Sequence, residues 1–393
     1  MYKAATATVL IVLGMLGLYR GASCQETLPS WQETRVSFSD WPDLPYTVVR
    51  SRFFGYQAAV DRDTTDGELA YDYCPFLMYD TKAQLYRLYA GGRWLRRGIA
   101  GADGDHVLQY VSPTGAPGSW VMPRNRPEFW LPQEEGRTDL WYSCNCLEPE
   151  VVRVGDTYYM YAQVQGNPAA RNDDPEVTET PGVDRIILFT SPDGTDWQRV
   201  STSRGVVVNL DSPAQTALHH EEVIYVPWDA DGQPWWLYVA ADVEGRPQGY
   251  YRLRSADPTT YDWASRQRSA LSQYGNQIGY LRDLPEGPLF VRITFASLEN
   301  GKTVPSLQFS RDGLNWRWGD NGAALMAGSE DEDRNRNCYF LGLSTLDGTG
   351  ELMTTGPASY RALYVATTCA TPVAPEIFHA EIGLGEMQLH LGP

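Results

Sequence analysis

The sequence predicts an all-β fold, and three observations lead to that prediction. Five tryptophans end similar phrases, in which a short apolar run leads to a Ser, then a turn rich in Asp, Pro or Gly, then the Trp; they are Trp41, Trp120, Trp197, Trp263 and Trp316. Short runs rich in aromatic and β-branched residues alternate between apolar and polar positions. No long segment has the 3.6-residue hydrophobic period of a helix. A strand-and-turn unit that recurs in this way indicates a β-propeller with insertions between its strands.

Turn residues separate the strands that precede each Trp. In the clearest repeat the turns are Gly155-Asp156 and Asp193-Gly194, because Gly tolerates a positive φ and Asp hydrogen-bonds the backbone of its own turn. The strands expected are residues 75–80, 84–92 and 106–112 in the first repeat; 150–154, 157–164, 185–191 and 197–200 in the second; 222–228, 234–241 and 249–255 in the third; 278–283, 289–297 and 305–310 in the fourth; and 338–344, 360–368 and 380–391 in the fifth.

The ring of repeats is expected to close through the N-terminus. Only 77 residues follow Trp316 and they contain no further Trp phrase, whereas residues 34–41 carry such a phrase without the strands that should precede it. A strand at 34–41 that completes the last repeat would remove two open sheet edges. We therefore predict a five-bladed β-propeller closed by an N-terminal strand. Six blades would need residues 42–70 to form a unit of their own, and they contain too few alternating runs.

The composition restricts the partners and the compartment. The 393 residues carry a net charge of −17, which argues against nucleic acid and anionic lipid as partners. Residues 1–24 are expected to be a signal peptide, with Lys3 before an apolar run of about ten residues and small residues after it. No later stretch is long and apolar enough to span a membrane. Residues 25–393 are expected to be a single domain, secreted or periplasmic, with a lipoprotein anchored through Cys24 as the alternative.

Disulfides suit an exported protein. Five cysteines lie beyond the expected signal peptide: Cys74, Cys144, Cys146, Cys338 and Cys369. We expect Cys338 to be linked to Cys369, and Cys74 to be linked to Cys144 or Cys146, which leaves one thiol unpaired. Zinc is not expected, because Cys144 and Cys146 have no second Cys/His pair at the spacing of a zinc finger.

The starts of the innermost strands should line an axial pocket, since these strands begin near the central channel of a propeller. Aligned on their apolar pairs, the first three repeats place at one equivalent position Cys74, Glu148 and His220, and at the next Pro75, Pro149 and Glu221. The two-residue alternation of a strand predicts pairs on shared faces: Asp72 with Cys74, Glu148 with Glu150, and His220 with Glu222.

Carboxylates that reach one pocket from several blades suit the cleavage of a glycosidic bond. That reaction needs one acid to protonate the leaving oxygen and a second carboxylate as base or nucleophile. Crowded like charges in a partly buried site raise the pKa of one carboxyl and keep it protonated. The candidate catalytic residues are Asp72, Glu148, Glu150, Glu221 and Glu222. Any one of them could instead bind backbone donors or carry solvent-facing charge.

Residues 148–151, a Gly-Asp turn and residues 157–161 resemble the inner-strand phrase of five-bladed glycoside hydrolases, namely the arabinanase/β-xylosidase family 43 and the invertase/levansucrase families. The phrases SPDGTDW and SRDGLNW resemble their blade-closing turns. The resemblance implies an acidic residue from each of three blades, with Asp72 as base or nucleophile, Glu148 as stabiliser of the transition state, and Glu221 or Glu222 as acid. Cys74 replaces the Asp that these families have before the first-blade Pro, and their acid phrase is absent. These departures indicate a distant member.

Aromatic side chains near the rim could stack on sugar rings. We expect Trp141, Tyr142 and Trp228, together with His220, to bind substrate. No cofactor is expected. The acidic residues 329–333 offer the oxygen ligands that calcium prefers but lack the ligand spacing of an EF-hand loop, so a solvated acidic loop is favoured over a structural calcium site.

The sequence therefore predicts a secreted glycoside hydrolase that cleaves an oligo- or polysaccharide by carboxylate acid/base catalysis in the axial pocket. The alternative is a propeller without catalytic activity that binds a glycan or a protein. Three carboxylates that converge in an axial pocket would favour the enzyme, whereas a flat aromatic rim without them would favour the binding protein.

Overall fold

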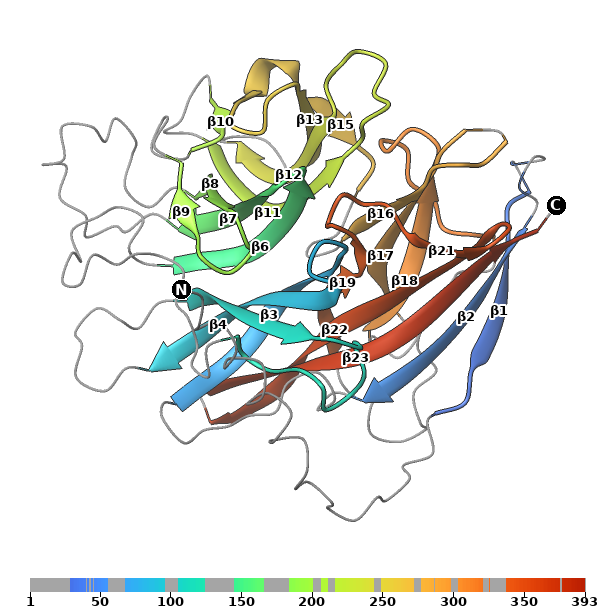
Figure 1. The fold of residues 1–393 in the computed structure, drawn as a ribbon, viewed down its shortest axis with the longest axis horizontal. Coiled ribbons are helices and arrows are strands. Elements are labelled where there is room, and N and C mark those ends of the chain that lie inside the picture. The colour runs from blue at the N-terminus through green and yellow to red at the C-terminus, as the bar shows by residue number, and fades with distance from the viewer. Residues whose placement is uncertain are drawn as a thin grey trace, which may run out of the picture. The chain divides into compact units, whose positions relative to one another are not determined.

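Five sheets are arranged in a ring and form a five-bladed β-propeller (Figure 1). The structure is a computed structural model, and Trp31–Pro393 form one compact unit in it. The residues that it describes are 29–39, 41, 44, 46–55, 68–95, 105–123, 145–165, 184–200, 206–210, 216–243, 249–271, 277–285, 287–297, 303–320, 325, 337–374 and 377–392. The expected signal peptide lies outside this part of the chain. Among the described residues, no helix is long and apolar enough to cross a membrane.

The first four blades follow one another along the chain. Blade 1 contains β3 (Glu68–Asp80), β4 (Leu85–Leu95) and β5 (Asp105–Ser112), with β20 (Thr345–Leu346) added beside β3. Blade 2 contains β6 (Asn145–Val154), β7 (Thr157–Gln165), β8 (Arg185–Ser191) and β9 (Gln198–Arg199). Blade 3 contains β11 (Thr216–Tyr225), β12 (Trp235–Val243), β13 (Gly249–Ser255) and β15 (Gln267–Ser269). Blade 4 contains β16 (Ile278–Leu281), β17 (Leu289–Ser297) and β18 (Thr303–Ser310).

Among the described residues, two short strands and one turn of helix stand outside the blades. The strand β10 (Val208–Asn209) pairs in parallel with β14 (Tyr261–Asp262). The 3-10 helix η3 (Trp263–Ser265) follows β14 directly, and the Asp262 carboxylate caps it by accepting from the backbone N–H of Ala264.

The fifth blade joins the two ends of the compact unit and confirms the predicted closure. Its sheet runs in the order β1 (Gln32–Ser37), β2 (Tyr46–Gly55), β23 (Ile377–Leu391), β22 (Ser359–Ala374) and β19 (Asn337–Leu343), and β21 (Met353–Gly356) also pairs with β22. The direct partner of β1 is β2, and β2 in turn pairs with β23. Residues 46–55 are therefore the second strand of this closure, not part of a sixth blade.

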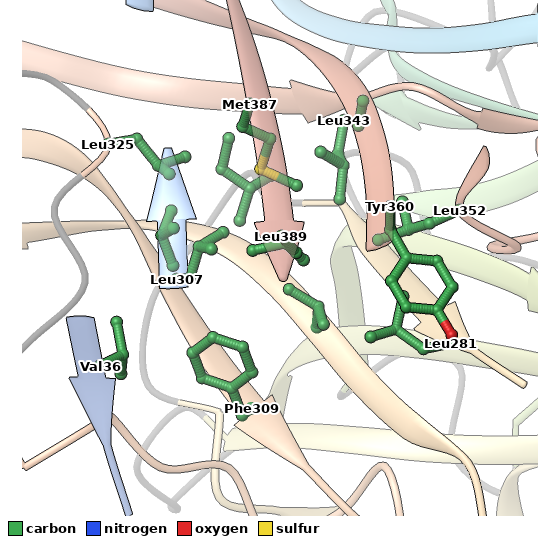
Figure 2. Close-up of a cluster of buried hydrophobic side chains, with 14 of the residues drawn as sticks. Val36, Leu281, Leu307, Phe309, Leu325, Leu343, Leu352, Tyr360, Met387 and Leu389 are labelled. Atoms are coloured by element: carbon green, nitrogen blue, oxygen red, sulfur yellow. The ribbon is translucent and has the colours of Figure 1, made fainter. Parts of the chain in front are cut away.

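A hydrophobic cluster stabilises the closure. Val36 from the N-terminal segment lies with Leu307 and Phe309 of β18 and with Leu389 of β23 (Figure 2). Phe38 belongs to the same cluster, and all five side chains are almost fully buried. The apolar contacts therefore extend from blade 4 to both halves of the fifth blade. Each buried side chain of this size contributes about 1.5–3 kcal/mol relative to its exposed state.

The repeated Trp phrase fastens neighbouring blades. In blade 2 the Ser191 hydroxyl accepts from the Gly194 N–H, and the Asp193 carboxylate accepts from two further N–H groups of the turn. The Gly194 carbonyl then accepts from Arg87 and Tyr89 of blade 1. The turn after β18 repeats this pattern and is bound by Tyr238 and Arg252 of blade 3. Trp197 and Trp316, which end these two phrases, are buried, and so are Trp120 and Trp263.

Residues 345–352 lie between β19 and β21 of the fifth blade and are called the axial loop below. This loop connects the inner strands of blades 1 to 4. Asp347 N–H donates to the Tyr79 carbonyl of β3, and the Asp347 carbonyl accepts from Arg153 N–H of β6. The carbonyls of Thr349 and Gly350 accept from the N–H groups of Tyr225 in β11 and Tyr280 in β16. These bonds join the C-terminal ends of all four strands, so the axial loop closes this end of the channel.

One of the two predicted disulfides is wrong. Cys74 is buried and is a thiol, not half of a bridge to Cys144 or Cys146. Its sulfur contacts the Glu148 carboxylate instead, as the next section describes. In the fifth blade the strand register pairs Cys338 with Thr368 and Cys369 with Asn337. The side chains of Cys338 and Cys369 lie outside the described part of the structure, so the bridge between them stays a prediction.

Candidate active site

The inner strands of three successive blades carry the same irregularity. In β3, β6 and β11 two consecutive residues face a single residue of the neighbouring strand, which is the pattern of a β-bulge. The first residue of each bulge has a positive φ: Cys74 (47°), Glu148 (52°) and His220 (52°). These are the three residues that the sequence alignment placed at one equivalent position.

Left-handed backbone at a residue other than glycine costs on the order of 1–3 kcal/mol, and such residues cluster at functional sites. The bulge also explains why adjacent side chains, such as His220 and Glu221, reach the same cavity. Strict alternation would send them to opposite faces of the sheet. Glu148 and Glu150, which we expected to share a face, both line this cavity. Glu222, which we expected to share a face with His220, is not among the described residues that line it.

The three bulge residues contact one another. His220 Nδ1 lies 2.7 Å from Glu148 Oε1, and the Cys74 thiol donates to the same oxygen at 3.5 Å. The carboxylate of blade 2 is thus placed between an imidazole from blade 3 and a thiol from blade 1. A carboxylate in this position can accept a proton or stabilise a neighbouring positive charge.

Two further glutamates in this cluster hold their protons unusually tightly. Burial raises the pKa of Glu150 well above its usual range, and the charges of Glu222, Glu221 and Glu148 contribute, while a hydrogen bond from Val223 N–H opposes the shift. Burial also raises the pKa of Glu221, and the charge of Glu148 raises it further. Among the described residues, neither oxygen of the Glu221 carboxyl has a hydrogen-bond partner of ordinary geometry. The Gln163 and Glu221 backbone N–H groups offset this burial only in part.

Glu222 lies in a different environment, although it is the neighbour of Glu221 in the chain. Its carboxylate accepts from Arg292 of β17 at 2.9 Å, and both side chains are almost fully buried. An arginine is always charged in proteins, so this contact stabilises the ionised form of Glu222. Within the described part of the chain, Glu222 therefore has an ion-pair partner, and Glu221 has none.

A cavity with about 260 Å³ of empty space lies at this cluster. Blades 1 to 3 contribute Cys74, Pro75, Glu148, Glu150, His220 and Glu221, and β19 of the fifth blade contributes Phe340 and Leu341. Part of that space is open to solvent. Within the described residues, no group of three His, Cys, Asp or Glu side chains could hold a metal ion.

The remaining predicted site residues are distributed as follows. Asp72 is in β3, but its side chain lies outside the described part of the structure, as do Trp141, Tyr142 and the acidic residues 329–333. Trp228 follows the far end of β11, where its ring packs against Tyr280 at 4.6 Å between centroids. It is not among the described residues that line the cavity.

Sequence reasoning missed Arg292, Gln163 and Gln277. The first two are polar residues inside otherwise apolar strands, a pattern that signals a buried partner. The Gln277 amide connects the backbones of the first and last blades, because its oxygen accepts from Leu343 N–H at 2.7 Å and its nitrogen donates to the Leu77 carbonyl.

Comparison with known proteins relates this fold to carbohydrate-active enzymes. No family model and no curated sequence matches the chain. Among solved structures, a GH62 hydrolase in complex with xylotriose has a TM-score of 0.52 at 9% identity and covers 84% of this chain and 95% of its own. The family 117 glycoside hydrolase Zg3597 from the marine bacterium Zobellia galactanivorans has a TM-score of 0.52 at 14% identity, with coverages of 92% and 90%.

A third similar structure is the β-1,2-mannobiose phosphorylase from Listeria innocua, with a TM-score of 0.50 at 9% identity and coverages of 86% and 96%. The chain has the five-bladed propeller fold of these enzymes. The fold thus agrees with the resemblance seen in the inner-strand and turn phrases. The sequence identities are low, so the reaction has to be inferred from the site itself.

Proposed function

We propose that the protein is a secreted glycoside hydrolase that cleaves a glycosidic bond of an oligo- or polysaccharide in the axial cavity. The observation that carries the proposal is the contrast between two carboxyl groups of this cavity. Glu221 is almost fully buried, and this burial raises the pKa of its carboxyl well above the usual range. Glu148 contacts the His220 imidazole. An acid and a carboxylate side by side are what glycoside hydrolysis requires.

In this mechanism Glu221 protonates the leaving oxygen. Glu148 faces the positive charge that develops on the sugar ring, and His220 and Cys74 hold its carboxylate in place. Asp72 remains the proposed base or nucleophile. Of the two glutamates considered for the acid, Glu221 is favoured because Glu222 binds Arg292. Burial and the nearby charge of Glu148 both favour the protonated form of Glu221, which is the form that a general acid needs.

The first experiment is a screen of the purified protein against plant, algal and bacterial polysaccharides and aryl glycosides. Each substrate is tested with and without inorganic phosphate, which separates hydrolysis from phosphorolysis. Release of reducing sugar without phosphate supports the proposal. Binding of a glycan in calorimetry without any cleavage would favour the alternative, a glycan-binding propeller.

The role of Glu221 is tested with substrates that differ in their leaving group. Glu221→Gln should reduce kcat about 10²–10⁴-fold on natural glycosides, the usual effect of one general acid. It should lose far less on dinitrophenyl glycosides, whose leaving group needs no proton. Glu148→Gln should lose activity on both kinds of substrate. Glu33→Gln, an exposed change on β1, is the control. Equal losses for Glu221→Gln on both substrates would exclude the acid role.

A further inference from the structure

His219, next to the cavity residue His220, lies between two carboxylates. Its Nδ1 is 2.8 Å from Asp184 Oδ2, and its Nε2 is 3.1 Å from Asp242 Oδ2. An ionised carboxylate only accepts hydrogen bonds, and a neutral imidazole has a single N–H to donate. Both contacts can be hydrogen bonds only when both ring nitrogens carry protons. The two short contacts therefore favour the imidazolium form of His219, although the Gln163 amide nitrogen also lies 3.5 Å from Nδ1.

A continuous set of hydrogen bonds leads from this imidazolium to the bulge of β11. The Asp184 oxygen that faces His219 also accepts from the Gln163 amide nitrogen at 2.9 Å. The Gln163 amide oxygen accepts from the backbone N–H of His220 at 3.2 Å. His220 is the residue with positive φ, and its side chain contacts Glu148. The order is thus Asp242, His219, Asp184, Gln163 and then the strained backbone.

We propose that this hydrogen-bonded series, called the relay below, positions the bulge that carries His220 and Glu221, and that it does so only while His219 is protonated. The proposal rests on the proposed function, because the consequence for activity assumes that Glu221 is the acid. His219, Asp184 and Gln163 are then positioning residues, since they act on the reacting groups through the backbone of β11.

The charged groups around His219 come from three elements. Asp184 precedes β8, Asp242 is on β12, and on β11 itself the His220 ring lies 6.0 Å away, centroid to centroid, with Glu221 beyond it. Gln163 of β7 carries no charge, and the Arg185 guanidinium binds the Asp184 carbonyl. Burial lowers the pKa of His219, but its bonds to Asp184 and Asp242 outweigh burial and raise the pKa above the ordinary 6.5.

Loss of the His219 proton removes one of its two bonds. The lone pair of one nitrogen then faces a carboxylate, and these two groups repel each other. Asp242 can turn away, because its side chain is 56% exposed. Asp184 cannot leave as easily, since Gln163 also binds it. The bulge should loosen as pH rises through the pKa of His219, and kcat should fall with it while KM changes little.

The test uses Asp242→Asn, which changes an exposed side chain outside the cavity, with the exposed Asp283→Asn as control. NMR of the protein labelled at its five histidines gives the pKa of His219, with His219→Gln for assignment. We expect a value above 6.5 that falls in Asp242→Asn and not in Asp283→Asn. Amide exchange at His220 and the alkaline limb of kcat should both shift to lower pH by the same amount.

A double-mutant cycle separates the relay from a simple change of charge near Glu221. Gln163→Leu removes the link without changing any charge, so it should lower kcat about tenfold and abolish any further effect of Asp242→Asn. Additive effects of the two changes on kcat, or a His219 pKa at or below 6.5, would overturn the inference while leaving the hydrolase proposal intact. If no substrate is cleaved, exchange at the His220 amide that does not depend on the His219 proton would overturn the inference by itself.

Discussion

Gly348→Ala should destabilise the protein through one contact of the axial loop. Gly348 has a φ of +68°, and a Cβ added there would lie 1.8 Å from the Val151 carbonyl oxygen and 2.9 Å from its carbon. Val151 is in the middle of β6, where it pairs with Met160 of β7. Its carbonyl cannot rotate away as a flexible side chain would, so either β6 or the axial loop must move.

The magnitude follows from two contributions. Alanine at this φ costs roughly 1 kcal/mol more than glycine, and the overlap adds about 1–3 kcal/mol, the usual range for overpacking. The sum is about 2–4 kcal/mol. Unfolding entropy is about 2.1 cal/mol/K per residue, so over a unit that spans Trp31–Pro393 the melting temperature should fall by about 3–5 °C.

The matched control is Gly232→Ala, because Gly232 has the same φ of +68° and nothing within 4 Å of the added Cβ. It should lose only the backbone contribution, about 1 kcal/mol, and melt about 1 °C lower. Scanning calorimetry of the two variants and the parent measures the difference. If the two variants melt together, the axial loop is not packed against β6 as described, and the closed channel end must be reconsidered.

Three further experiments test the buried charges and the thiol. Glu150→Gln should weaken the dependence of stability on pH. The pKa of Glu150 is raised in the folded state, so the parent loses stability as pH rises above about 4.5 towards that raised value. Urea unfolding at pH 5 and pH 8 should show a larger loss in the parent than in the variant, where only Glu221 still contributes. Arg292→Met should cost about 3–5 kcal/mol by leaving Glu222 buried without its cation, and the added change Glu222→Leu should recover most of it. Alkylation of the denatured, unreduced protein should label Cys74, and a Cys74 peptide that appears only after reduction would contradict its thiol state.

The fold could be predicted because its signals are local. In the phrases that end at Trp197 and Trp316, the Ser, Asp and Gly bond within one turn, so the phrase has the same meaning at both places in the chain. The equivalence of Cys74, Glu148 and His220 could be predicted for a similar reason, since the apolar pairs that follow them set the register of each inner strand.

The arrangement of the site could be predicted only in part. A bulge adds one residue to a strand and changes which way the following side chains point. Two-residue alternation contains no sign of a bulge, so it could not by itself establish the faces of Glu150 and Glu222. The bond between Glu222 and Arg292 and the relay around His219 join residues of different blades. Such pairs depend on how neighbouring blades are rotated against each other, which a single sequence does not express. Trp228 packs against Tyr280, and its contact with substrate stays a prediction, because an aromatic residue beside a turn carries no local sign of which side chains it meets.

The composition of the fifth blade has a consequence for how the protein is made. Thr47 of β2 pairs with Leu391 of β23, so the N-terminal hairpin emerges from the ribosome long before its partner strand exists. Until then one edge of β2 and apolar side chains such as Val36 have nothing to cover them, and exposed strand edges promote aggregation. Contacts this distant in sequence also form slowly. We therefore expect newly made chains to need protection by a chaperone until the last strand is available, and a fragment without β23 to leave the ring open.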